Sequence, residues 1–88
     1  SSRKAKMNWG LEGKVAIISG AGRGVGRALA LAMVADGAKV VVNDIDNEPA
    51  QQTMREAVDN GGQCIAVVGD VTKPGVAEQM VDEARITD

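Results

Sequence analysis

The stretch from Ser19 to Gly26, SGAGRGVG, places four glycines directly after an apolar run at residues 15–18. Glycine adopts positive φ without strain and leaves the main chain open to a ligand. Where such a loop leads into a helix, the unpaired N–H groups of the first turn carry partial positive charge and bind phosphate groups. The stretch therefore predicts an anion site built from backbone amides.

Two acidic residues follow later apolar runs. Asp44 comes 24 positions after Gly20, and Asp70 follows the run CIAVVG. A carboxylate roughly 20 residues beyond a glycine loop is placed to accept hydrogen bonds from the hydroxyls of a ribose. The structural alternatives are that Asp44 starts a turn and that Asp70 or Thr72 caps the next helix.

The elements that must position these residues alternate along the chain. Nearly continuous apolar runs are typical of parallel strands covered on both faces, and they occur at residues 15–18, 39–43 and 64–68. Helical periodicity with suitable ends occupies residues 24–36, residues 48–60 and the segment from about Pro74. The order predicts an α/β fold, a Rossmann-type βαβαβα half of a doubly wound parallel sheet with strand order 3-2-1. We expect this domain at residues 11–88, after an N-terminal arm at residues 1–10.

Several side chains are expected to face the core of this domain. Asn47 is expected to cap the second helix, and Cys64 is interpreted as a small buried hydrophobe. The predicted inward stripes of the three helices are Val25, Leu29, Ala32 and Met33; Met54, Ala57 and Val58; and Val76, Met80, Val81 and Ala84.

The composition of the 88-residue chain limits the classes of function. A net charge of -2 offers no general attraction for nucleic acid or an anionic membrane, and Trp9 as the only aromatic residue excludes base stacking on several rings. Because the sequence has no His and only Cys64 as cysteine, we expect neither a zinc site of the usual ligands nor an internal disulfide. No apolar stretch reaches the roughly 18 residues of a membrane span. We expect a small cytoplasmic protein with no metal, no nucleic-acid partner and no membrane partner.

The glycine spacing distinguishes between known motifs. No Gly-Lys-Ser/Thr of a P-loop is present, and GxGxxG counted from Gly20 would end on Val25. The pattern that fits is GxxxGxG at Gly20, Gly24 and Gly26. With Ser19 before it and the lead LEGKVAII, it resembles the TGxxxGxG motif of the short-chain dehydrogenase/reductase (SDR) family, with Ser in place of Thr.

This resemblance implies an NAD(P)-dependent oxidoreductase that transfers a hydride between nicotinamide and an alcohol or carbonyl substrate. It implies that Asp44 binds the ribose, Asp70 the adenine amino group, and the Val71 backbone the adenine ring. Arg23 before the second motif glycine favours NADP, whereas the carboxylate of Asp44 favours NAD, and we expect NAD. The expected cofactor-binding residues are Ser19, Gly20, Arg23, Gly24, Val25, Gly26, Asp44, Ile45, Asp70 and Val71.

The family's catalytic residues have no counterpart in the sequence. The chain has no tyrosine, so the Tyr-x-x-x-Lys pair is missing, and the Asn-Asn-Ala-Gly segment is missing too. We therefore assign no catalytic residue and expect a cofactor-binding half of an SDR protein that turns over no substrate by itself. In that half the strand at residues 15–18 is an unpaired apolar edge, so we expect a homo-oligomer, aggregation or a further segment that completes the sheet.

Two other functions are compatible with parts of the pattern. Gly20, Gly22 and Gly24 also fit the GxGxG of S-adenosylmethionine-dependent methyltransferases, although Ile18 and Ser19 stand where those proteins usually carry a carboxylate. A non-catalytic nucleotide-binding module is the remaining alternative.

Overall fold

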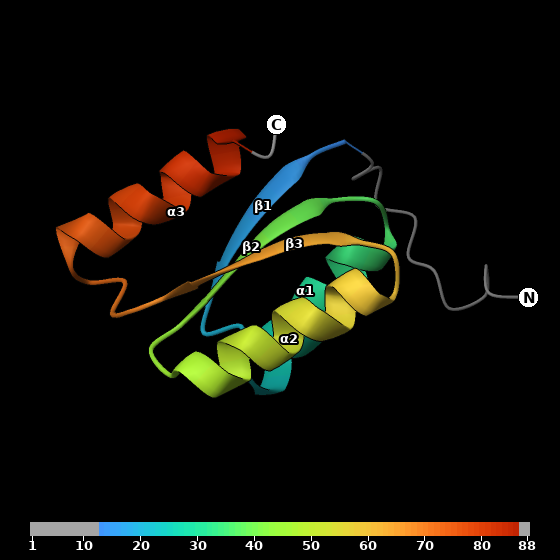
Figure 1. Ribbon diagram of the computed structural model, residues 1–88, viewed down its shortest axis with the longest axis horizontal. Helices are drawn as coiled ribbons and strands as arrows, with labels where there is room; N and C mark the ends of the chain where they lie inside the picture. The colour runs from blue at the N-terminus through green and yellow to red at the C-terminus, as the bar shows by residue number, and fades with distance from the viewer. Residues whose placement is uncertain (1–12, 87–88) are drawn as a thin grey trace, which may run out of the picture.

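The computed structural model describes residues 13–86 and alternates strands with helices (Figure 1). The order is β1 (Val15–Ser19), α1 (Gly24–Ala35), β2 (Lys39–Asp44), α2 (Asn47–Asp59), β3 (Gln63–Val68) and α3 (Pro74–Ile86). The predicted βαβαβα order is confirmed. The N-terminal arm expected at residues 1–10 lies outside the described residues.

The three strands form one parallel sheet with β2 in the centre. The register pairs Ser19 with Asn43 across β1 and β2, and Asp44 with Val68 across β2 and β3. The strand order 3-2-1 is therefore confirmed. Because the strands are parallel, their carboxyl ends lie at one edge of the sheet, and the three loops that follow them leave from that edge.

Helices α1 and α2 cover one face of the sheet, and α3 covers the other (Figure 1). Val40 and Val42 pack into the core under α1 and α2, whereas Val41 packs with Val67 and Met80 under α3. Successive side chains of a strand point to opposite faces, so a strand buried on both sides needs apolar residues at every position. This explains the uninterrupted VVV of β2.

The predicted inward stripe of α1 was wrong at Val25 and Leu29 and correct at Met33, which packs against the core. Val25 is 85% exposed and Leu29 is 40% exposed, while Ala30 and Val34 are the buried residues of the helix. Since apolar residues occur all around α1, periodicity alone did not define its inner face. Close packing of a helix on a sheet favours small side chains, and the backbone places Ala30 there.

The other two stripes were correct in part. In α2, Ala57 is buried and Met54 packs against the core, but Val58 is exposed, and the remaining buried positions are Ala50 and Thr53. In α3, Met80 is buried with Val76 and Ala84 against it, but Val81 is exposed.

The start of α2 and the environment of Cys64 complete the fold. Asn47 is the first residue of α2 and not its cap; Asp46 holds the extended cap position but makes no side-chain capping bond. Cys64 is buried, as predicted, and burial raises the pKa of its thiol to about 11. None of the described helices has both the length and the apolar character needed to span a bilayer.

Candidate functional site

The loop after β1 depends on glycine at three positions for two different reasons. Gly20 and Gly24 have φ of 65° and 59°, in the left-handed region where other residues are strained. Gly26 has ordinary φ, but an added Cβ would lie 2.3 Å from the carbonyl oxygen of Gly20. The first turn of α1 therefore packs directly on the backbone of the loop, and the three glycines of GxxxGxG are explained by geometry.

Residue Ala21 anchors this loop to the rest of the domain. Its N–H donates to the carbonyl of Asn43 at 2.8 Å, two residues after Ser19, which is the last residue of β1 paired with β2. Its carbonyl accepts from Oγ1 of Thr53, a fully buried residue of α2, at 3.0 Å. The loop is thus fixed to both β2 and α2 before it enters α1.

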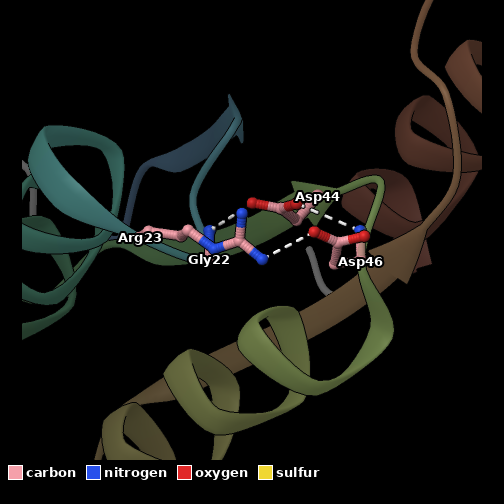
Figure 2. Close-up of polar contacts among 4 residues, drawn as sticks. All are labelled: Gly22, Arg23, Asp44 and Asp46. Atoms are coloured by element: carbon pink, nitrogen blue, oxygen red, sulfur yellow. Dashed lines mark hydrogen bonds and ion pairs between the residues drawn. The ribbon is translucent and has the colours of Figure 1, made fainter.

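Asp44 ends β2 directly beside the glycine loop (Figure 2). Its Oδ2 accepts from the N–H of Gly22 at 3.0 Å, and its Oδ1 accepts from the N–H of Asp46 at 3.1 Å. An added Cβ at Gly22 would lie 2.7 Å from Oδ2 and 2.6 Å from Cβ of Pro49, so this glycine is required as well. The turn expected as the structural alternative is therefore present, in the bond from Asp44 to Asp46.

The contacts of Asp44 also leave it able to accept further bonds. A carboxylate offers about four lone-pair sites, and the two backbone amides occupy one on each oxygen. Asp44 is buried, with 8% of the residue's surface exposed, and the two amide bonds hold its carboxylate in one orientation. Such a carboxylate is suited to accept from two neighbouring hydroxyl groups.

Arg23 connects the glycine loop to the turn between β2 and α2. Its Nη2 lies 2.6 Å from Oδ2 of Asp46, and both side chains are at least half exposed. Figure 2 shows the Arg23 side chain extended across the gap beside Asp44. Sequence reasoning missed Asp46; the signal present was an acidic residue two positions after the strand's terminal carboxylate.

Asn43 is a second residue that the sequence analysis did not identify. It is buried, and its Nδ2 donates to the carbonyls of Val67 at 3.0 Å and of Gly69 at 3.1 Å. The N–H of Gly69 in turn donates to the carbonyl of Asp44 at 3.0 Å. The loop after β3 therefore begins hydrogen-bonded to the end of β2. The available signal was an amide side chain directly after the apolar run Val40-Val41-Val42.

Asp70 lies in this third loop and is partly exposed to solvent. Its Oδ1 accepts from Oγ1 of Thr72 at 2.6 Å and from the N–H of Thr72 at 2.9 Å. These bonds, the side-chain bond first, hold the pKa of Asp70 below its ordinary value. Both bonds stay within the loop ahead of α3, so the carboxylate of Asp70 is not bound to the helix as a cap.

The sheet brings the predicted site residues to one edge, in three neighbouring loops. Three exposed apolar side chains lie beside the polar ones: Val25 in the first turn of α1, Ile45 after β2 and Val71 after β3. Gly24, Val25 and Gly26 open α1, where N–H groups have no carbonyl partner within the helix. The arrangement combines amide donors for an anion, an oriented carboxylate and small apolar surfaces. All ten predicted residues belong to this edge: Ser19, Gly20, Arg23, Gly24, Val25, Gly26, Asp44, Ile45, Asp70 and Val71.

A parallel βαβαβα sheet with a glycine loop after its first strand defines a Rossmann-type fold. The sequence model of the family described as short chain dehydrogenase matches residues 14–87. The chain belongs to that family of oxidoreductases.

Relatives of known name agree with this assignment. Versicolorin reductase stcU of Emericella nidulans is 42% identical over 78 residues, which cover 88% of this chain and 30% of that protein. A hydroxynaphthalene reductase-like protein Arp2 of Metarhizium acridum is 40% identical over 75 residues, 84% of this chain and 28% of the relative. The chain thus spans under a third of the length of these relatives.

Solved structures show the same fold. A hydroxysteroid dehydrogenase from Escherichia coli superimposes with a TM-score of 0.81 at 38% identity, over 88% of this chain and 32% of the other. A short chain dehydrogenase/reductase from Burkholderia phymatum, solved in complex with NAD, gives 0.80 at 35% identity over 84% of this chain and 26% of the other.

Proposed function

We propose that residues 11–88 bind NAD at the carboxyl edge of the sheet and form the cofactor-binding part of an oxidoreductase. That oxidoreductase transfers a hydride between the nicotinamide and an alcohol or carbonyl substrate. The observation that carries this proposal is the placement of Asp44, with each oxygen fixed by a backbone N–H beside the glycine loop. A neighbouring structure solved with NAD supports a nicotinamide dinucleotide as the ligand.

The remaining groups of the edge have matching roles in this proposal. The free N–H groups of Gly24, Val25 and Gly26 receive the diphosphate, since the amino end of a helix favours an anion. Asp44 accepts from the ribose hydroxyls of the adenosine. Ile45 and Val71 enclose the adenine ring, and Asp70 accepts from its amino group. Bound in this way, NAD supplies the hydride chemistry, and this chain orients the cofactor.

The charge of Asp44 is the basis for proposing NAD over NADP. A carboxylate that accepts from free 2′- and 3′-hydroxyls stands where NADP carries a phosphate. Two like charges about 4 Å apart near a protein surface repel by about 4 kcal/mol at an effective dielectric of 20. Arg23 is the nearby cation that would offset this repulsion, and it is already paired with Asp46.

A fluorescence titration with NADH and NADPH tests the proposal. We expect tighter binding of NADH, and a loss of about tenfold or more in NADH affinity for Asp44→Asn, since hydrogen bonds to a charged group contribute about 1.5–3 kcal/mol. Asp59→Asn is the matched control, because it removes the same charge from the last residue of α2, ahead of β3. Tighter binding of NADPH than of NADH by the unaltered chain contradicts the choice of NAD.

The same titration distinguishes NADH from the alternative ligand, S-adenosylmethionine. S-adenosylmethionine is expected to give no binding, because Ile18 and Ser19 precede the glycines where a carboxylate would meet its cationic end. Binding of S-adenosylmethionine without NADH would replace the proposal with a methyltransferase function.

The proposal also predicts whether this chain by itself oxidises NADH. The chain has no tyrosine to act as general acid, so we expect NADH to be bound but not oxidised with a panel of carbonyl compounds.

We further propose that copies of the chain associate through β1. Within residues 13–86 this strand pairs only with β2. Its Ile17 is 43% exposed and lies beside a groove between β1 and α3. Light scattering tests this, and a cleanly monomeric species contradicts it. The proposed compartment is the cytoplasm.

A further inference from the structure

We propose that Asp46 is a specificity-determining residue, which disfavours 2′-phosphorylated cofactors by holding the guanidinium of Arg23. It is a positioning residue, because it acts on the ligand through Arg23. The inference rests on the proposed binding of the adenosine ribose at Asp44.

The position of Asp46 is fixed by the same carboxylate that is proposed to take the ribose. Its N–H donates to Oδ1 of Asp44 at 3.1 Å, and its backbone is extended, with φ -100° and ψ 129°. The side chain of Asp46 makes no capping bond to α2. Its carboxylate is instead turned to the glycine loop, where it bonds Arg23 (Figure 2).

The side chain of Arg23 extends from the glycine loop toward Asp46. It holds the cap position of α1 in an extended conformation, with φ -150° and ψ 164°, and makes no side-chain capping bond. Its Nη2 lies 2.6 Å from Oδ2 of Asp46, and the side chain passes beside Asp44 (Figure 2). In the proposed binding mode, a phosphate on the ribose 2′ position would lie near the carboxylates of Asp44 and Asp46. The nearby guanidinium of Arg23 already donates one of its hydrogen bonds to Asp46.

The magnitude follows from the exposure of the pair. Exposed ion pairs contribute at most about fivefold to an equilibrium, and the side chains of Arg23 and Asp46 are 63% and 50% exposed. Neutralising Asp46 releases Arg23 and also removes one negative charge near the phosphate. We therefore expect NADPH affinity to rise about fivefold to tenfold in Asp46→Asn, while NADH affinity changes less than about twofold.

Titration of the 88-residue chain with NADH and NADPH at low salt tests the inference in four variants. Asp46→Asn should raise the ratio of NADPH to NADH affinity, and the rise should shrink at high salt, where exposed charges are screened. Asn is well tolerated before a helix, and a circular dichroism spectrum checks the fold. Glu56→Gln is the matched control: it removes the same charge from an ion pair with Arg27 that also joins α2 to α1, and should leave the ratio unchanged.

Arg23→Ala, alone and with Asp46→Asn, shows whether Arg23 carries the effect. We expect the gain in NADPH affinity to fall to about twofold or less when Arg23 is absent, because only the removed charge of Asp46 then contributes. An equal gain in the Arg23→Ala background, or an unchanged ratio in Asp46→Asn when the unaltered chain binds NADH, overturns the inference and leaves the proposed function intact. Absence of NADH binding by the unaltered chain overturns the proposed function and the inference with it.

Discussion

The loops after β1 and β3 lie at the same edge of the sheet but are held in different ways. The loop after β1 is fixed by distant residues: Asn43 and Asp44 of β2 and Thr53 of α2 all bond its backbone. The loop after β3 is tied to β2 at Gly69 and is then shaped by bonds between Asp70 and Thr72.

This difference separates two kinds of site residue. In the first loop a change alters the packing of α1, α2 and the sheet together, so stability and ligand binding are expected to fall together. In the second loop the polar bonds are exposed and local. Changes there are expected to affect electrostatics at the site while the free energy of unfolding stays nearly constant.

The largest expected difference is in the free energy of unfolding when alanine is placed in the first turn of the helix that follows each loop. Gly26→Ala places a Cβ 2.3 Å from the Gly20 carbonyl oxygen and should lower the free energy of unfolding by about 2–3 kcal/mol. Gly75→Ala is the matched control, since an added Cβ in the first turn of α3 meets no atom within 4 Å. It should be neutral or stabilise by about 0.5–1 kcal/mol. Urea unfolding measures both, and equal losses would mean that α1 does not pack on its loop as described.

A smaller effect is expected from the buried hydroxyl of Thr53. Thr53→Val keeps the shape of the side chain but leaves the buried carbonyl of Ala21 without this donor, at a cost of about 1–2 kcal/mol. Thr72→Val, on the exposed loop, should change the free energy of unfolding by less than about 0.5 kcal/mol. A loss for Thr72→Val as large as that for Thr53→Val would remove the distinction between the loops.

The smallest effect is a change in the titration of Asp70. The Thr72 hydroxyl is the first cause of its lowered pKa, so Thr72→Val should raise that pKa toward the ordinary value, while the bond from the Thr72 N–H keeps part of the shift. Because the folded pKa lies below the unfolded one, the bonds to Asp70 stabilise the fold above the unfolded pKa. This contribution is lost as the pH falls through the folded pKa. An NMR titration of the Asp70 carboxyl carbon checks this, and an unchanged pKa would contradict the assigned cause.

The sequence predicted the features that depend on local pattern. The apolar strands, the three helices, the strand order and the clustering of Gly20, Asp44 and Asp70 at one edge follow from β/α alternation and from glycine chemistry. The strands were each predicted one residue short, at Ser19, Asp44 and Gln63, because polar side chains at a sheet edge do not continue the apolar run.

The features that depend on tertiary contacts were not predicted. Because apolar residues occur around the whole of α1, the pattern does not define which face of this helix is buried. The fit of Ala30 and Val34 against the sheet decides it, and Val25 is left exposed. The ion pair of Arg23 with Asp46 joins residues 23 positions apart, and no spacing rule connects them. The binding roles of the edge residues remain predictions.

Gly22 has a consequence for attempts to redesign the site. Its amide is satisfied by Asp44, and its side-chain direction is closed from one side by that carboxylate and from the other by Pro49. Replacing Asp44 alone would leave the Gly22 N–H without its acceptor. Pro49 would still prevent a larger residue at position 22. A chimera intended to transfer the proposed cofactor preference must therefore include the loop, the strand end and the first turn of α2 together.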